Sequence, residues 1–206
     1  MAGLDFNSTP LTIILLILNI GASLYALRFD RSLIDRCSLN VGRVLDHRED
    51  DRILLSSFFH ADGGHLLFNM LTLYFFGPDM ERTLGTLHFL VLYFGSELAA
   101  SLLTLYFQRK NKAYSSIGAS GAISGVITAF CILEPTAKIY LLFIPIGIPA
   151  IIYAPAYIAY SMYAMSNTGS GGRVAHEAHL GGALAGAVLL LLLYPDAIQT
   201  FFSHFR

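Results

Sequence analysis

The sequence contains few charged residues for its length. Only 13% of its 206 residues are charged and 55% are hydrophobic, whereas soluble domains carry about 25% charged residues. The mean hydropathy is +0.60, and the charges are clustered between long uncharged runs, as in membrane spans joined by loops. A net charge of -1 gives no attraction to nucleic acid. We therefore expect an integral, multi-pass membrane protein without a nucleic-acid partner.

Other features are also missing. The two cysteines, Cys37 and Cys131, make no disulfide framework. The first ten residues lack the basic region of a secretory signal and the arginines of a mitochondrial transit peptide. The first apolar run is therefore expected to be retained as a span. No repeat or second domain is visible, and residues 1–206 are interpreted as a single membrane domain.

Six apolar segments approach the roughly 17 to 25 residues that a membrane helix needs. They cover residues 11–27, 64–76, 87–107, 120–133, 139–165 and 179–194. Prolines in the fifth segment predict a kinked and mobile helix. Residues 28–52 hold six basic and six acidic side chains and are expected to lie against the membrane face. The prediction is an all-α bundle of six transmembrane helices, with a membrane-associated loop between the first two.

Two polar side chains lie within the second predicted span. His65 and Asn69 are four residues apart, so they share one helix face, and both can donate hydrogen bonds. Polar groups at membrane depth are costly and therefore suggest function. The alternative interpretation is a polar contact between helices.

Ser120 stands among glycines where an apolar helix is predicted to begin. Unpaired N–H groups and positive partial charge at a helix N-terminus can stabilise an oxyanion. Gly121 and Gly125 form a small-x-x-x-small pair that allows another helix to approach closely. The alternative is a packing motif whose serines bond back to their own helix.

His179 begins the last predicted span, and Gly182 and Gly186 follow it on the same face. The alternative interpretation is an interfacial histidine that caps a packed helix.

Together these clusters fit amide hydrolysis, which needs a nucleophile, a base and donors for the oxyanion. Ser120 is the candidate nucleophile and His179 the candidate base. The Ser120 backbone N–H, His65 and Asn69 are the candidate oxyanion donors. No aspartate completes a triad, so we predict a Ser-His dyad.

A metal site is the competing hypothesis. Its candidate ligands would be His60, His65, His176, Glu177 and His179. The H-E-A-H spacing is not H-E-x-x-H, and no motif for a third ligand is present. The spacing therefore argues against a metal site.

Four motifs in order resemble the rhomboid family of intramembrane proteases. They are H-x-x-x-N at 65–69, G-x-x-x-E-x-x-x-G at 77–85, G-x-S-G at 118–121 and H-x-x-G-x-x-x-G at 179–186. The resemblance implies a serine endopeptidase that cleaves transmembrane segments of membrane proteins within the lipid bilayer, with no metal and no cofactor and with the fifth helix as a lateral gate. Small residues before the cut and a helix-destabilising segment are favoured. We expect the cell (inner) membrane as its location. The alternative is a catalytically inactive relative that binds and traffics membrane proteins.

The sequence departs from the family pattern in three places. Asp51-Arg52 stands where many members have a tryptophan–arginine pair, and Ser124 stands where some bacterial members stack a tyrosine on the histidine. The orientation of His179 must therefore come from elsewhere. Glu97 lies inside the third predicted span, and we hypothesise that it is protonated or paired with a polar neighbour.

Orientation has two conflicting predictors. The family topology places the first, third and fifth loops outside, and these loops hold ten of the thirteen Lys and Arg residues. The positive-inside rule favours the opposite orientation.

Overall fold

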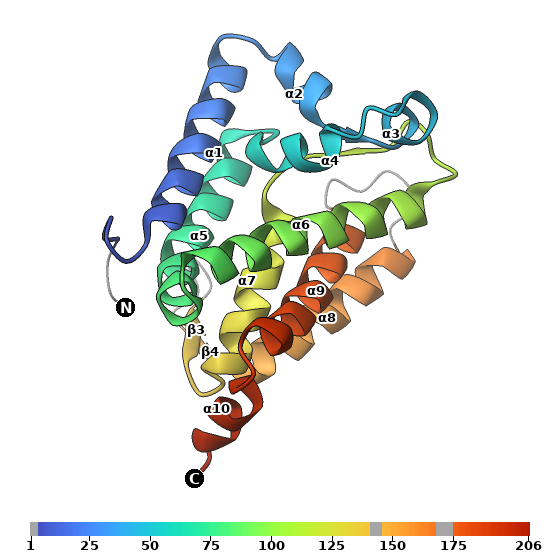
Figure 1. The fold of residues 1–206 in the computed structure, drawn as a ribbon. Helices are drawn as coiled ribbons and strands as arrows, with labels where there is room; N and C mark the ends of the chain where they lie inside the picture. The colour runs from blue at the N-terminus through green and yellow to red at the C-terminus, as the bar shows by residue number, and fades with distance from the viewer. Residues whose placement is uncertain (1–3, 141–145, 168–174) are drawn as a thin grey trace.

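The protein is predominantly helical, in a computed structural model that describes residues 4–140, 146–167 and 175–206. Its long helices are α1 (Pro10–Arg28), α5 (Gly63–Leu84), α6 (Thr86–Gln108), α7 (Ser120–Leu133), α8 (Ala150–Asn167) and α9 (His176–Leu193). Shorter segments are α2 (Ser32–Cys37), α3 (Val41–His47), α4 (Arg52–Leu55), the 3₁₀ turn η1 (Ser56–Phe58) and α10 (Ala197–Ser203). Strand β1 (Leu39–Asn40) pairs with β2 (Ser115–Ser116), and β3 (Lys138–Tyr140) pairs with β4 (Gly147–Pro149). Figure 1 shows α1 and α8 on opposite sides of the bundle, with α7 between them.

Within the described residues, three helices are long and apolar enough to cross a membrane: α1, α6 and α9. Their outward faces expose large apolar side chains such as Ile17, Leu102 and Leu192, which suits contact with lipid. Helix α7 has 14 residues. At 1.5 Å per residue it is about 21 Å long, which is less than the ~30 Å thickness of the hydrocarbon layer. Most of its residues are buried by neighbouring helices, so α7 is an internal helix whose length lipid does not set.

The predicted spans agree with α1, α6, α7 and α9 within three residues at each end. Helix α5 is longer than predicted and continues through Pro78 to Leu84. The predicted start of the fifth span was wrong, because residues 138–140 and 147–149 form the strands β3 and β4 and α8 begins at Ala150. Pro149 lacks an N–H group and disfavours helical backbone before it, so α8 begins only after this residue. Pro145 lies outside the described residues.

The G-x-x-x-E-x-x-x-G motif joins α1, α5 and α6. The buried Glu81 carboxylate accepts hydrogen bonds from the backbone N–H groups of Leu11 (2.9 Å) and Thr12 (2.7 Å). Those groups lie in the first turn of α1, where a helix leaves its N–H groups unpaired. Gly77 packs on Thr12, and Gly85, with a φ of 78°, separates α5 from α6. The motif thus caps α1 and fixes its position beside α5.

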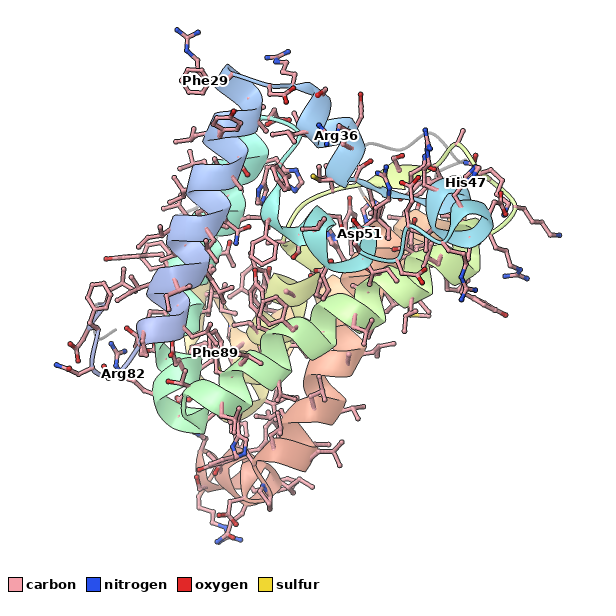
Figure 2. All side chains as sticks on the ribbon, turned by 45° about the horizontal axis from the view of Figure 1, so that its top comes forward. Phe29, Arg36, His47, Asp51, Arg82 and Phe89 are labelled. Carbon is pink, nitrogen blue, oxygen red and sulfur yellow. The ribbon has the colours of Figure 1, made fainter. Side chains whose placement is uncertain are left out.

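The charged segment 28–52 folds against one end of the bundle. Figure 2 shows Arg36, His47 and Asp51 at that end and Arg82 at the other. Leu39, Val41 and Val44 form a small apolar cluster with Leu105 of α6. Pairing of β1 with β2 ties the segment to the chain just before α7. The segment is therefore ordered by contacts with α6 and β2.

Arg52 anchors the charged segment through hydrogen bonds and an ion pair. Its buried guanidinium donates to the carbonyl oxygens of Asp35 and Ser38, both at 2.9 Å, and pairs with Glu49 at 2.6 Å. The hydrogen bond from Arg52 lowers the pKa of the Glu49 carboxyl. Arg52 therefore stabilises the fold of the charged segment, even though the tryptophan that precedes it in many family members is absent.

Candidate active site

Ser120 and His179 meet at one end of α7 and α9. Ser120 is the first residue of α7, and His179 lies in the first turn of α9. The Nε2 atom of His179 is 3.0 Å from the Oγ atom of Ser120. His176 lies edge-on to the His179 ring, with centroids 6.0 Å apart. The structure thus brings together the predicted nucleophile and the predicted base.

Glycines set the separation of the two helices. A Cβ atom added at Gly182 would collide with the backbone of Gly121, and one added at Gly186 would collide with the backbone of Gly125. The backbones of α7 and α9 are therefore in direct contact at two successive turns, which larger residues would prevent. This close contact holds the first turns of both helices side by side and keeps Ser120 within reach of His179.

The residues before Ser120 are held by two histidines. Gly118 has a φ of 123°, and a Cβ atom there would lie 2.5 Å from Cε1 of His65. His60 is fully buried, accepts from the Ala119 N–H at 3.5 Å and contacts Ser23 Oγ through Nδ1 at 2.9 Å. Burial lowers the pKa of His60 to about 3, so the ring is neutral, and Nε2 accepts from Ala119 when the one ring proton is on Nδ1. These contacts fix the loop that leads into α7.

A cavity of about 810 Å³ opens in front of the dyad. Ser120, His179, His65 and Asn69 all line it. The Asn69 amide donates one N–H to the His65 carbonyl oxygen at 3.1 Å, which leaves its second N–H for another acceptor. The predicted oxyanion side chains therefore share one space with the dyad.

Backbone donors remain at the start of α7. The Ala122 N–H donates to Glu97 Oε2 at 3.1 Å. Within the described part of the chain, the N–H groups of Ser120 and Gly121 have no hydrogen-bond acceptor. Two unpaired donors thus stand beside Ser120 Oγ, as expected at a helix N-terminus.

Glu97 lies behind α7 and is paired with polar groups, as hypothesised. Besides the Ala122 N–H, its carboxyl group contacts Ser101 Oγ at 3.3 Å. Ser101 Oγ also lies 3.2 Å from the Ile53 carbonyl oxygen. A protonated Glu97 satisfies every group here, because it donates to Ser101 while Ser101 donates to Ile53.

Sequence reasoning missed Tyr157 on α8. Its ring stacks on His179, with centroids 5.9 Å apart and planes at 27°, and its hydroxyl lies 2.7 Å from Ser124 Oγ. The sequence shows only a tyrosine among other apolar residues of α8, and no motif marks it. The departure at Ser124, which left the His179 orientation unexplained, was the available signal.

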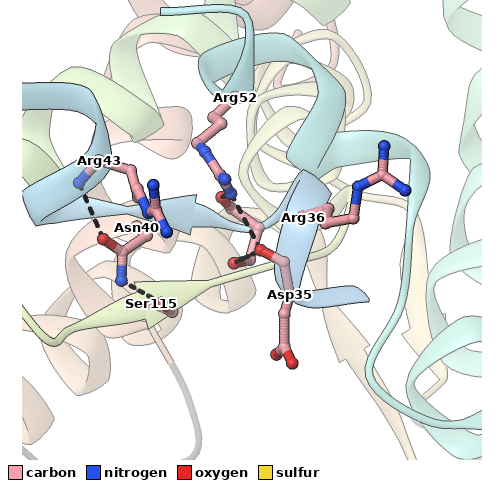
Figure 3. A pocket seen from close by; sticks show the side chains of 7 residues that line it. Asp35, Arg36, Asn40, Arg43, Arg52 and Ser115 are labelled. Carbon is pink, nitrogen blue, oxygen red and sulfur yellow. Dashed lines mark hydrogen bonds between the residues drawn. The ribbon is translucent and has the colours of Figure 1, made fainter. Parts of the chain in front are cut away.

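A second, polar pocket of about 300 Å³ lies between the charged segment and β2. Figure 3 shows Arg52 reaching toward Asp35 and shows Asn40 hydrogen-bonded to Ser115. Two of its arginines pair with Glu49. The pocket thus forms part of the anchoring of the charged segment.

The structure does not gather the histidines of the metal hypothesis into one cluster. Among the described residues there is no group of three or more His, Cys, Asp or Glu side chains placed to hold a metal ion. The His60 ring lies beside His65 on the α5 side, with centroids 5.0 Å apart, whereas His176 lies beside His179 on α9.

Comparison with known proteins identifies the family. The model of the Rhomboid domain matches residues 48–196. The chain is 35% identical over 139 residues to "Rhomboid protein 1, mitochondrial" of Saccharomyces cerevisiae, an alignment that covers 66% of this chain and 40% of that protein. It is 30% identical over 151 residues to "RHOMBOID-like protein 12, mitochondrial" of Arabidopsis thaliana, with 66% and 44% covered. It is 29% identical over 226 residues to "Rhomboid protease AarA" of Providencia stuartii, with 96% and 78% covered.

The chain thus spans less than half the length of the yeast and Arabidopsis relatives and most of the length of the bacterial one. The family match covers the G-x-S-G motif at 118–121, the H-x-x-G-x-x-x-G motif at 179–186 and the junction of α5 with α6. The chain belongs to the rhomboid family.

Proposed function

We propose that the protein is an intramembrane serine endopeptidase that cleaves transmembrane segments through a Ser120–His179 dyad. The observation that carries the proposal is the 3.0 Å contact between Ser120 Oγ and His179 Nε2, beside a cavity that both residues line. One similar protein, from Providencia stuartii, is named a rhomboid protease. Neither a metal nor a cofactor takes part in the proposed reaction.

In the proposed reaction His179 works first as a base and then as an acid. Its Nε2 atom accepts the Ser120 hydroxyl proton as Oγ attacks the carbonyl carbon of the scissile peptide. When the C–N bond breaks, His179 returns this proton to the leaving amine. Water then attacks the acyl-serine while His179 accepts its proton. His179 gives this proton to Ser120 Oγ as the ester C–O bond breaks, which releases the new carboxyl terminus and regenerates Ser120.

The negative charge that develops on the carbonyl oxygen needs donors in fixed positions. We assign this role to the Ser120 backbone N–H together with His65 and Asn69. The free N–H groups at the start of α7 and the shared cavity support the assignment. The close contacts of Gly121 with Gly182 and of Gly125 with Gly186 hold these donors at a fixed position relative to Ser120 and His179.

We propose that the whole chain forms one membrane domain in which α1, α5, α6, α7, α8 and α9 are six spans. Helix α7 is shorter than the hydrocarbon layer, and Ser120 is its first residue. The nucleophile therefore lies deeper in the membrane than the ends of the longer helices. The cavity, which is lined by both polar and apolar side chains, gives water access at that depth. A helical substrate keeps its carbonyl groups hydrogen-bonded internally, so the segment that is cut must first unwind, which favours small or helix-breaking residues.

Two aspects of the membrane setting are part of the same proposal. The charged segment 28–52 lies against the membrane on the side of Ser120, and the location is the cell inner membrane. The yeast and Arabidopsis relatives carry mitochondrial names, so the compartment is decided by localisation of the full chain in its own cell.

The test is labelling of the purified, detergent-solubilised protein with a fluorophosphonate probe. Wild type is expected to label, whereas Ser120→Ala and His179→Ala lose labelling by about 10³-fold or more. His176→Ala keeps most of the signal, because His179 contacts Ser120 and His176 does not. Ser203→Ala in α10 is the matched serine control and labels like wild type.

An unlabelled wild type, shown to be folded by its thermal transition, would contradict the proposal. It would favour the inactive relative that binds membrane proteins. Cleavage of a membrane substrate that a chelator abolishes would favour the metal hypothesis instead.

A further inference from the structure

The histidine of the dyad lacks the third group that usually orients such a base. Among the described residues, its one hydrogen bond joins Nε2 to the Ser120 hydroxyl, which donates when His179 is the base, and Nδ1 has no partner. A bond at one edge leaves the ring free to tilt about that edge. Productive proton transfer needs the base held in line with the nucleophile, so another contact must fix the plane of the ring.

Tyr157 of α8 provides that contact. Its ring lies against the His179 ring with centroids 5.9 Å apart and an angle of 27° between the planes. This offset-stacked arrangement is favoured for aromatic pairs, and it limits tilting of the imidazole. On its other side Tyr157 is stacked on Tyr153, with centroids 6.0 Å apart and planes at 6°. The His179 ring thus ends a stack of three rings.

The hydroxyl of Tyr157 is linked to the other member of the dyad through Ser124. Ser124 Oγ is 2.7 Å from the Tyr157 hydroxyl and 2.7 Å from the Ser120 carbonyl oxygen. A serine hydroxyl has one proton. Since the carbonyl can only accept, Ser124 donates to Ser120, and Tyr157 must donate to Ser124. One side chain therefore touches the base with its ring and the backbone of the nucleophile through one hydroxyl.

Tyr157 is half-buried and lies on the inner face of α8. In the part of α8 whose side chains are described, the fully buried positions are small: Ala150, Ala154, Ser161 and Ala164. Their spacing of three and four residues places them on the same face as Tyr157. A large polar-tipped side chain in the middle of this face is therefore placed to reach across to α7 and α9.

We propose that Tyr157 is a positioning residue that holds the His179 ring in line with Ser120, so that dyad geometry depends on α8 standing against α7 and α9. The inference rests on the proposed function. It adds that a movement of α8 away from α7 removes Tyr157 from His179 and Ser124 together. Entry of a substrate beside α8 and the alignment of the His179 ring with Ser120 are then linked through the Tyr157 side chain.

Four variants separate the contributions. Tyr157→Leu removes ring and hydroxyl, Tyr157→Phe removes only the hydroxyl, and Ser124→Ala removes only the link to Ser120. Tyr160→Leu is the matched control, because Tyr160 lies on the same helix, is exposed and contacts His176 instead of His179. The rate of fluorophosphonate labelling and the kcat and KM for a transmembrane substrate are measured for each.

Tyr157→Leu is expected to lower kcat and the labelling rate by up to ~10²-fold with little change in KM, because it misplaces the base without removing it. Tyr157→Phe keeps the stack and retains most of this activity. The double variant Tyr157→Phe/Ser124→Ala is expected to be no worse than the more affected single variant, since both break one chain of hydrogen bonds. Tyr160→Leu behaves like wild type.

A folded Tyr157→Leu protein that labels at the wild-type rate would overturn the inference while leaving the proposed function in place. So would a loss confined to KM, which would mean that Tyr157 only lines the substrate cavity. If the leucine variant fails to fold, the near-isosteric variants Tyr157→Phe and Ser124→Ala provide the test. If the activity losses of these two single variants simply add in the double variant, the inferred hydrogen-bond link from Tyr157 through Ser124 is contradicted. A wild type that does not label overturns the proposed function, and the inference falls with it.

Discussion

Helix α7 meets α9 and α8 in different ways. Against α9 the contact is backbone to backbone, at Gly121 with Gly182 and at Gly125 with Gly186. Against α8 the link to the site is a side chain, Tyr157, that reaches across to Ser124. Packed backbones cannot separate without moving whole helices, whereas a side-chain contact can break when one helix shifts slightly. The rigid side places Ser120 next to His179, and the adjustable side controls how the His179 ring is held.

The largest effect is expected from breaking the rigid side. Gly186→Val adds a branched side chain where Gly125 backbone atoms already stand, so the helices must separate and both labelling and thermal stability should be lost. Gly21→Val in α1 is the matched control, because a Cβ atom there meets nothing within 4 Å. Retained activity and an unchanged unfolding midpoint in Gly186→Val would contradict the account of the α7–α9 contact.

A smaller effect is expected on the side of α7 that packs against α6. Glu97→Leu removes the acceptor of the Ala122 N–H and one of the two partners of the Ser101 hydroxyl. A buried polar group left without its partner lowers the free energy of unfolding by about 1–3 kcal/mol. Glu97→Gln can accept from Ala122 and donate to Ser101, as a protonated acid does, so its stability and activity should stay near wild type. Thermal unfolding and labelling rates of both variants are compared. A glutamine variant as impaired as the leucine variant would contradict the protonated form.

The smallest effect is expected on the adjustable side. Ala154→Val adds two methyl groups to the buried face of α8, one turn before Tyr157. Overpacking of this kind costs about 1–3 kcal/mol, but α8 can shift outward, so the protein should fold and kcat should fall only several-fold. Ile152→Ala, on the exposed face of the same helix, is the control. Complete loss of activity in Ala154→Val would show that the α8 side is as rigid as the α9 side.

Much of this arrangement follows from the sequence. Long apolar runs predict α1, α6 and α9, since hydropathy reports directly on the length of a lipid-facing helix. Ser120 and His179 could be paired because each begins an apolar helix whose glycines imply a close partner. Small residues at fixed spacing predict close backbone contact between helices, and polar groups at membrane depth indicate a functional site.

Other parts depend on contacts that the sequence does not show. The start of α8 was predicted too early, because an apolar run containing prolines does not reveal that its first part pairs as strands. Nothing in the sequence marks Tyr157, since its role comes from the distance between α8 and Ser124. Glu97 was correctly expected to find polar partners, but that these are the N-terminus of α7 and Ser101 emerges only from the packing of α6 against α7.

The central claim is tested most directly by cleavage of a single-span membrane substrate with purified protein in liposomes. The substrate carries small residues and a glycine or proline near one end of its span. The account predicts cleavage by wild type in the presence of a chelator and none by Ser120→Ala or His179→Ala at equal protein incorporation. Cleavage by Ser120→Ala at the wild-type rate, or wild-type cleavage that stops when metal is removed, would contradict it.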